Sequence, residues 1–378
     1  MFAWLESLRA RRAERKLMAW HTPGRPVWPM RDAAAFAREG YARNAVAYRC
    51  VRLIAEAAAS APLKIGPADH PLAALLARPN PEQTGIELLE AFYGHLQVSG
   101  NAYLEAASID GAPPRELYVL RPDRMSVIPG ADGWPVGWEH RVGAHTRRFE
   151  RDPVSGDAPI LHLKLFHPSD DWHGLSPMEA AGFAIDIHNA GGAWNKALID
   201  NAARPSGALV FSGGERLSDE QFQRLKQELD DMHVGAGNAG RPIVLEGGLD
   251  WRPMSLSPAD MDFIHARHAA ARDIALAFGV PPMLLGIPGD NTYSNYREAN
   301  LALWRHTVLP LAQKGARALE AWIGARWPEA GSAAVGIDLD AVSALSVERD
   351  ALWTRIAAAD FLSEDEKRRL AGVEANNP

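Results

Sequence analysis

Cysteine is almost absent from this chain of 378 residues, in which Cys50 is the only one. A single thiol cannot close a disulfide within the chain or supply the several thiolates of a zinc or iron–sulfur cage. Such a sequence suits a reducing compartment, so we expect a cytoplasmic product. Cys50 also lies on the apolar face of an expected helix, and we interpret it as a core residue rather than a nucleophile.

Long hydrophobic runs are also lacking. No segment approaches the ~20 consecutive apolar residues of a membrane-spanning helix, and MFAWLESLRARRAERKLMAW lacks the apolar centre and cleavage site of a secretory signal. We therefore expect no membrane partner. The same leader carries a basic cluster: Arg9, Arg11, Arg12, Arg15 and Lys16. It is either a loosely ordered leader or a docking arm for an acidic partner.

An excess of positive charge is missing as well, because the formal net charge is −7. A protein that grips nucleic acid across its whole surface is normally basic, so any contact with DNA must be local or weak. The content of 47% hydrophobic and 23% charged residues is typical of a folded chain. At this length we expect two or three domains.

Catalytic motifs are scarce. The chain has neither a phosphate-binding Gly-x-x-x-x-Gly-Lys-Ser/Thr loop nor a Gly-x-Ser-x-Gly nucleophile elbow. One alternative to be weighed is a metal-dependent hydrolase, whose ligands would be the Asp170-Asp171 pair or a helical cluster: Asp260, Asp262, His265 and His268. The glutamate of a His-Glu-x-x-His site is missing, and Arg267 and Arg272 offer the acids simpler ion-pair partners. Accordingly, we expect no cofactor and no metal.

The first part of the chain, about 40–170, has the texture of one α+β domain. Apolar residues at helical spacing predict a helix from Asn44 to Ala61, which Pro62 ends before the short strand LKIG. Thr84 is the candidate N-cap of a later helix. Short β-like runs between Gly and Pro turns then extend to Phe166.

Two long helices follow. Ser176-Pro177-Met178-Glu179 predicts the start of a helix to about Asn201, roughly 40 Å long. Ser257-Pro258 predicts a second helix over Ala259–Phe278. Between them lies an insertion with the strand ALVF, a helix from Leu217 to about Val234 and a hairpin-like pair in RPIVLEGGLDWRPMSL.

The stretch FGVPPMLLGIPGDNTYSNYREAN, Phe278 to Asn300, is rich in helix breakers. Gly279 is placed as the left-handed C-cap of the second long helix, and the prolines after it forbid continuation. Asn295 and Glu298 predict the restart of a helix, kinked at Pro310. A strand-like GIDL and two helices follow, the last opened by a capping box at Ser363.

This order of features resembles the portal protein family of tailed bacteriophages, of the type found in long-tailed phages and gene transfer agents. The matching stretches lie between about Asn44 and Trp327: AVAYRCVRLIAEAAASAPLKI, HPLAALLARPNPEQTG, SGNAYLEAA, ELYVLRPDRM, GLSPMEAAGFAIDIHNAGGAWNKALIDNAARPSGAL, the segment LSDEQF to PPMLLG, and NTYSNYREAN. The resemblance implies a non-enzymatic, α+β subunit of a dodecameric ring at one capsid vertex of the virion, through which double-stranded DNA is packaged and ejected.

The resemblance also divides the chain into parts. They are an N-terminal basic arm (1–39), a wing (40–175), a first stem helix (176–203), an inserted α/β clip (204–257), a second stem helix (258–278), a tunnel loop (279–294), a kinked helix (295–328) and a small helical crown (329–378). A different head–tail connector ring is the alternative within the same particle.

Site residues and partners follow from these parts. The tunnel loop would present its DNA-facing residues: Ile287, Asp290, Asn291, Thr292, Tyr293 and Ser294. The clip would dock the large terminase subunit and the head–tail adaptor through Asp219, Glu220 and Glu228. The major capsid protein would surround the ring.

Overall fold

The computed structural model describes residues 20–22, 25–27, 33–109, 112–200, 207–211, 249–253, 263–288 and 293–372, together with residues 220, 223 and 227. These residues fall into two compact units. The first unit contains residues 33–182 and 274–372, and the second contains residues 20–27 and 183–273. The basic leader, 1–19, lies outside the described residues.

Two helices form the centre of the first unit. Helix α3, Ala45–Ser60, follows Asn44, whose side-chain oxygen accepts hydrogen bonds from the amides of Val46 and Ala47 at 3.1 and 2.9 Å. Helix α5, Gly85–Ser99, packs against it and begins with the Thr84–Glu87 capping box. Both predicted helix starts are therefore confirmed. The caps work because each side chain satisfies an amide that the helix leaves without a partner.

Short elements surround this pair. The predicted strand LKIG is β3, Leu63–Gly66, and it pairs with β12, Ala334–Ile337, from the far end of the chain. The elements between and before these helices are α2 (Ala33–Ala35), the π-helical turn η1 (Phe36–Tyr41) and α4 (Pro71–Ala77).

The strands of the first unit make two further antiparallel sheets. One has the order β5-β4-β9, and the other has the order β6-β7-β8. Their bounds are Asn101–Ala107 for β4, Glu116–Leu120 for β5, Met125–Pro129 for β6, Pro135–Val142 for β7, His145–Glu150 for β8 and Ile160–Lys164 for β9, with a short helix η2 at Pro122–Arg124. Tyr103, Trp138 and Phe149 form the core between the two sheets. The expected α+β character of this region is confirmed.

The first predicted long helix is interrupted. Helix α6, Pro177–Ala180, ends at Ala181, and helix α7, Gly182–Asp200, follows at once. Ser176 caps α6 as expected, since its hydroxyl accepts from the Glu179 amide at 2.9 Å. The predicted helix thus begins at its expected cap and ends at Asp200, close to Asn201, with an interruption at Ala181, whose amide still donates to the Pro177 carbonyl oxygen at 2.9 Å as in an α-helix.

The second unit holds α7, helix α9 (Phe263–Ala277, whose last residues belong to the first unit) and two strand pairs. The pairs are β1 (Trp20–Thr22) with β2 (Arg25–Val27), and β10 (Gly207–Phe211) with β11 (Leu249–Pro253). The predicted strand ALVF thus pairs with LDWRP. The remainder of the insertion lies largely outside the described residues.

Helix α9 ends at Ala277, and Gly279 follows with a φ of +65°, the left-handed conformation predicted for it. A short helix η4, Pro282–Leu285, follows. Helix α10 runs from Tyr293 to Leu303, so Asn295 is its third residue, and the prediction that Asn295 caps the helix was wrong. The capping pattern alone could not distinguish a residue before the helix from a residue within its first turn.

A kink was predicted at Pro310, and the irregularity lies just before it. Residues Trp304–Val308 form a π-helical turn, η5, between α10 and helix α11, Leu309–Ile323. Proline lacks an amide hydrogen and its ring clashes with the carbonyl four residues earlier, so a regular α-helical turn cannot be kept there. The wider π turn accommodates it.

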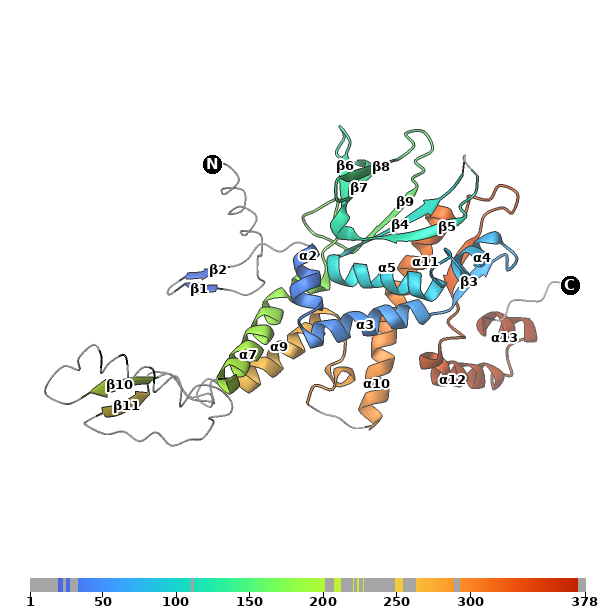
Figure 1. The fold of residues 1–378 in the computed structure, drawn as a ribbon. Coiled ribbons are helices and arrows are strands. Elements are labelled where there is room, and N and C mark those ends of the chain that lie inside the picture. The colour runs from blue at the N-terminus through green and yellow to red at the C-terminus, as the bar shows by residue number, and fades with distance from the viewer. Residues whose placement is uncertain are drawn as a thin grey trace. The chain divides into compact units, whose positions relative to one another are not determined.

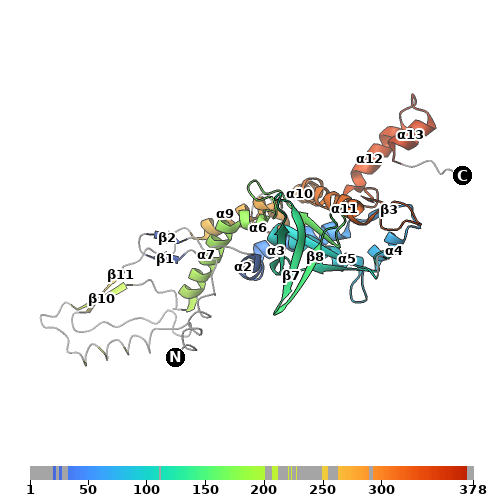
Figure 2. The same ribbon diagram turned by 90° about the horizontal axis from the view of Figure 1, so that it is seen from above.

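The C-terminal part contains the turn η6 (Ser343–Leu345), α12 (Ser346–Ala357) and α13 (Glu364–Leu370). The capping box of Ser363 with Glu366 is confirmed. Both views draw these two helices at the edge of the first unit, clear of its sheets (Figures 1 and 2). Among the described residues, no helix is long and apolar enough to cross a membrane.

Candidate functional site

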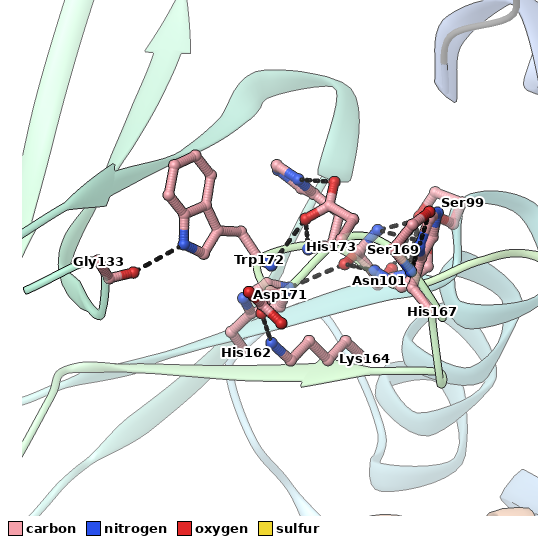
Figure 3. Close-up of polar contacts among 12 residues, drawn as sticks. Ser99, Asn101, Gly133, His162, Lys164, His167, Ser169, Asp171, Trp172 and His173 are labelled. Atoms are coloured by element: carbon pink, nitrogen blue, oxygen red, sulfur yellow. Dashed lines mark hydrogen bonds and ion pairs between the residues drawn. The ribbon is translucent and has the colours of Figure 1, made fainter.

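The chain leaves strand β9 through a loop, residues 165–176, that is held by the buried side chain of Asn101 (Figure 3). The Asn101 side-chain oxygen accepts from the Gly174 amide at 2.9 Å and contacts His162 Nε2 at 2.9 Å. Its side-chain nitrogen donates to the Ser99 carbonyl oxygen at 2.8 Å. One amide group therefore joins the end of α5, strand β9 and the entry to α6.

Two glycines let the backbone segments meet at this point. A Cβ atom added to Gly100 would lie 2.2 Å from the Gly174 carbonyl oxygen, and one added to Gly174 would lie 2.1 Å from the Gly100 carbonyl oxygen. Gly100 also has a φ of +74°, which favours glycine. The Leu165 amide donates to the Gly100 carbonyl oxygen at 2.8 Å. We call residues 99–101, 162 and 165–176 the junction.

His162 is held in one protonation state at the junction. Its ring stacks on Tyr103 at 4.2 Å between centroids, and Trp138 Nε1 donates to its Nδ1 at 3.4 Å. Because Nδ1 accepts, the hydrogen is on Nε2 and is donated to Asn101. Burial lowers the pKa of His162 to about 3, and the charge of nearby Lys164 acts in the same direction.

The Asp170-Asp171 pair holds the loop together. Asp170 accepts from the amides of Trp172 and His173 at 2.7 and 3.0 Å, and its other oxygen lies 3.1 Å from His173 Nδ1. Partial burial opposes ionisation, but these donors hold the pKa of Asp170 below its usual value. The Asp171 backbone oxygen accepts from Lys164 Nζ, and Trp172 Nε1 donates to Gly133. The carboxylate of Asp170 is thus committed to loop geometry.

The helical cluster gives no support to a metal site either. Asp260 and Asp262 lie outside the described residues, and His265 and His268 are exposed on α9. Among the described residues, no group of three side chains is arranged to hold a metal ion. Arg267, expected to pair with an acid, donates to His188 Nε2 on α7 at 3.4 Å.

Cys50 lies in the core, as the sequence indicated. Its side chain is fully buried, and burial raises the pKa of the thiol to about 12. A thiol that stays protonated is a poor nucleophile.

The segment proposed to face DNA is described in part. Ile287 is only 7% exposed, so in the single subunit its side chain packs inward. Asp290, Asn291 and Thr292 lie outside the described residues. Tyr293 and Ser294 form the first turn of α10. The exposed surface of this segment is therefore carried by residues other than Ile287.

Of the three acidic residues predicted to dock partners, only one belongs to the described part of the chain. Asp219 and Glu228 lie outside the described residues, whereas Glu220 is helical and exposed. The structure therefore gives no distance between these three acids.

Sequence reasoning missed Asn101 and His162. Both lie in strands whose sequences have an ordinary alternating pattern. Asn101 contacts His162 at a separation of 61 residues and Gly174 at a separation of 73 residues. No local pattern marks such a pair.

Comparisons with known proteins place the chain in a family. A family model described as phage portal protein matches residues 45–372. An uncharacterized protein of Rickettsia bellii (strain RML369-C) is 41% identical over 343 residues, covering 89% of this chain and 88% of that protein. The portal protein of Enterobacteria phage HK97 is 25% identical over 344 residues, covering 82% of this chain and 76% of that protein.

A solved structure adds the third comparison. A chain in the neck of a native gene transfer agent particle, computed with C12 symmetry, has a TM-score of 0.71 and is 53% identical. The match covers 93% of this chain and 96% of that chain. By its sequence and its fold, this chain belongs to the phage portal protein family.

Proposed function

We propose that this protein is the portal subunit of a phage or gene transfer agent particle. Copies of the chain form a ring at one vertex of the capsid, and double-stranded DNA passes through the ring during packaging and ejection. The observation that carries the proposal is the family match over residues 45–372, joined to 53% identity with a chain of a C12-symmetric particle neck. The protein is located in the virion.

The parts of the chain take the portal roles in sequence order. Residues 40–175 are the wing, 176–203 and 258–278 are stem helices, 204–257 are the clip, 279–294 are the tunnel loop, 295–328 are the kinked helix and 329–378 are the crown. The hydrogen bond between Arg267 and His188 supports pairing of the two stem helices, because it joins α9 to α7 within the second unit.

Glycines in the first stem helix support close packing around a ring. A Cβ atom added to Gly192, which is partly exposed in the single chain, would meet no atom within 4 Å among the described residues. Glycine costs about 1 kcal/mol of helix propensity against alanine, so a use outside the single chain is needed to explain it. The neighbouring subunit's stem is the surface that would approach here.

The electrostatics suit passage of DNA rather than tight binding. The chain has a net charge of −7, and the segment from Phe278 to Asn300 contains no lysine and one arginine, Arg297. Each phosphate neutralised by a cation strengthens binding and makes it salt-dependent, so a poorly basic wall lets the duplex slide. In the proposal, the loop residues 290–294 face the duplex.

The remaining partners are assigned to the clip and the wing. The clip, with Asp219, Glu220 and Glu228, docks the large terminase subunit during packaging and the head–tail adaptor afterwards, and the wing contacts the major capsid protein. The portal does not catalyse a reaction, and the terminase supplies the energy for translocation. Metal-dependent hydrolysis is not supported, because Asp170 is used within its own loop and His265 and His268 form no ligand group with other described residues.

A packaging assay tests the proposal. Cells that produce the particle are compared with cells in which this chain is absent, and the DNA protected from nuclease inside particles is measured. We expect protected DNA to be lost without the chain and restored by supplying it. Undiminished packaging without the chain would overturn the proposed function.

A further inference from the structure

The two C-terminal helices expose large apolar side chains. No residue of α12 or α13 is buried in the single chain. Val347 is 67% exposed, Trp353 43%, Phe361 87% and Leu370 55%. Large apolar side chains gathered on one short helical hairpin mark a surface that another molecule covers.

Few contacts attach this hairpin to the rest of its unit. Arg305 of the π turn forms an ion pair with Glu348. Other contacts lie within the hairpin: the Arg349 guanidinium is 5.3 Å from the Trp353 ring centroid, and Lys367 Nζ donates to the Ala357 carbonyl oxygen at 3.4 Å. Exposed ion pairs add little stability, and helices of this length are marginal without a packed face. The hairpin is therefore expected to gain stability from a covering surface.

The charges on α13 are divided between its two ends. Its first turn carries Glu364, Asp365 and Glu366, and its last turn carries Lys367, Arg368 and Arg369. Glu366 is used in the cap with Ser363. Glu364, Asp365, Arg368 and Arg369 are exposed, and the described part of the chain offers them no ion-pair partner.

A helix with one acidic and one basic end is complementary to a copy of itself placed head to tail. Closed rings are built from such heterologous contacts, in which one surface of a subunit meets a different surface of the next. The apolar residues beside these charges supply the area that would be buried.

We propose that the hairpin of α12 and α13, residues 346–370, docks on the same hairpin of the neighbouring copy. The acidic end of one α13 faces the basic end of the next, and Trp353 and Phe361 are covered between them. This inference rests on the proposed ring and adds a specific contact that closes it at the C-terminal helices.

Disulfide cross-linking tests the contact, because the only native cysteine is buried and gives little background. A chain carrying both Glu364→Cys and Arg369→Cys is purified as the full-length ring and oxidised. We expect a ladder of covalent multimers. Chains with either substitution alone should give no ladder, and a mixture of the two single variants should give dimers. The matched control pairs Glu364→Cys with Val154→Cys, a residue that is 94% exposed on a different loop, and should give no ladder.

Charge reversal provides a test that does not depend on geometry. Chains with Glu364→Lys and Asp365→Lys, or with Arg368→Glu and Arg369→Glu, place like charges together and should cross-link about tenfold less through a Trp353→Cys and Phe361→Cys pair. Combining all four reversals restores opposite charges, and cross-linking should recover. A complex of another protein with the hairpin, or unchanged cross-linking in the reversed chains, would overturn the inference.

Images of the same samples separate this inference from the proposed function. Intact rings without the ladder would overturn the hairpin contact while leaving the ring in place. A single-Cys control chain that stays monomeric would contradict the ring itself, and with it the basis of the inference.

Discussion

The Thr307 hydroxyl donates a hydrogen bond to the Gly279 carbonyl oxygen at 2.7 Å. This contact joins the left-handed glycine just after α9 to the π turn before α11, so two irregular points of the backbone support each other. Gly279 has a φ of +65°, and a Cβ atom there would lie 2.8 Å from Thr307 Oγ1. The end of the second proposed stem helix is thus specified by both conformation and space.

We predict that Gly279→Ala weakens this connection by about 1–3 kcal/mol, because alanine is strained at positive φ and its methyl group would press on Thr307. The measurement is hydrogen exchange at the Val280 amide, which donates to Ala275 at 2.9 Å. Gly143→Ala is the matched control. It also has positive φ, at +60°, but its Cβ would meet nothing within 4 Å, so it should cost less.

The same pair should show coupling. Adding Thr307→Ala to Gly279→Ala removes the crowded hydroxyl. The loss of stability in the double variant should therefore be smaller than the sum of the losses in the two single variants. Strict additivity would mean that Thr307 does not limit the space at Gly279.

Asn101→Ala should open the junction. The substitution leaves the Gly174 amide and His162 Nε2 without their shared acceptor, a loss of about 2 kcal/mol or more. Hydrogen exchange should rise across residues 165–176. Asn80→Ala is the control, since Asn80 is also buried but bonds to Leu117 and Gln83. If Asn80→Ala speeds exchange in residues 165–176 as much as Asn101→Ala does, the effect is a general loss of stability and not the opening of the junction.

The junction should weaken in acid. In the folded chain the pKa of His162 is lowered to about 3 from an ordinary value of 6.5. Between these values the unfolded chain binds a proton that the folded chain does not, so stability is greatest above about pH 6.5 and falls as the pH is lowered. One such group contributes about 1.4 kcal/mol per pH unit.

Comparison of variants isolates this contribution between pH 5 and 6.5. His162→Gln should reduce the slope of unfolding free energy against pH by the amount that one proton contributes, about 1.4 kcal/mol per pH unit. The measurement is unfolding of the first unit. Burial also lowers the pKa of His95, to about 4, so His95→Gln should reduce the slope independently. A slope in His162→Gln equal to that of the unchanged protein would contradict the burial of a neutral imidazole at the junction.

Deletion of residues 288–292 tests the proposed tunnel loop. Ile287 is kept because its side chain is buried and its loss would disturb the core. We expect rings to form normally while the DNA retained in particles decreases. If the variant stays folded but no longer forms rings, the segment has a role in assembly rather than in contact with DNA.

Local signals predicted much of this fold. Thr84, Ser176, Gly279 and Ser363 were identified as caps from their neighbours, because a cap depends on a few adjacent residues. Local signals were insufficient at Ala181, which interrupts the first long helix, and at Asn295, which lies inside α10 rather than at its start.

Distant relationships could not be predicted from the sequence. Strand β12 pairs with β3 from the opposite end of the chain, and Asn101 meets Gly174 across 73 residues. Such partners are selected by the folded core and leave no periodic pattern. The roles proposed for residues 290–294 and for Asp219 and Glu228 came from the family resemblance, and they remain predictions.

Imaging of the purified full-length protein tests the central claim most directly. Negative-stain electron microscopy should show rings with a central hole, and class averages should show the twelvefold symmetry of the related particle neck. Compact monomers without rings, at concentrations where the chain is folded, would contradict the portal account.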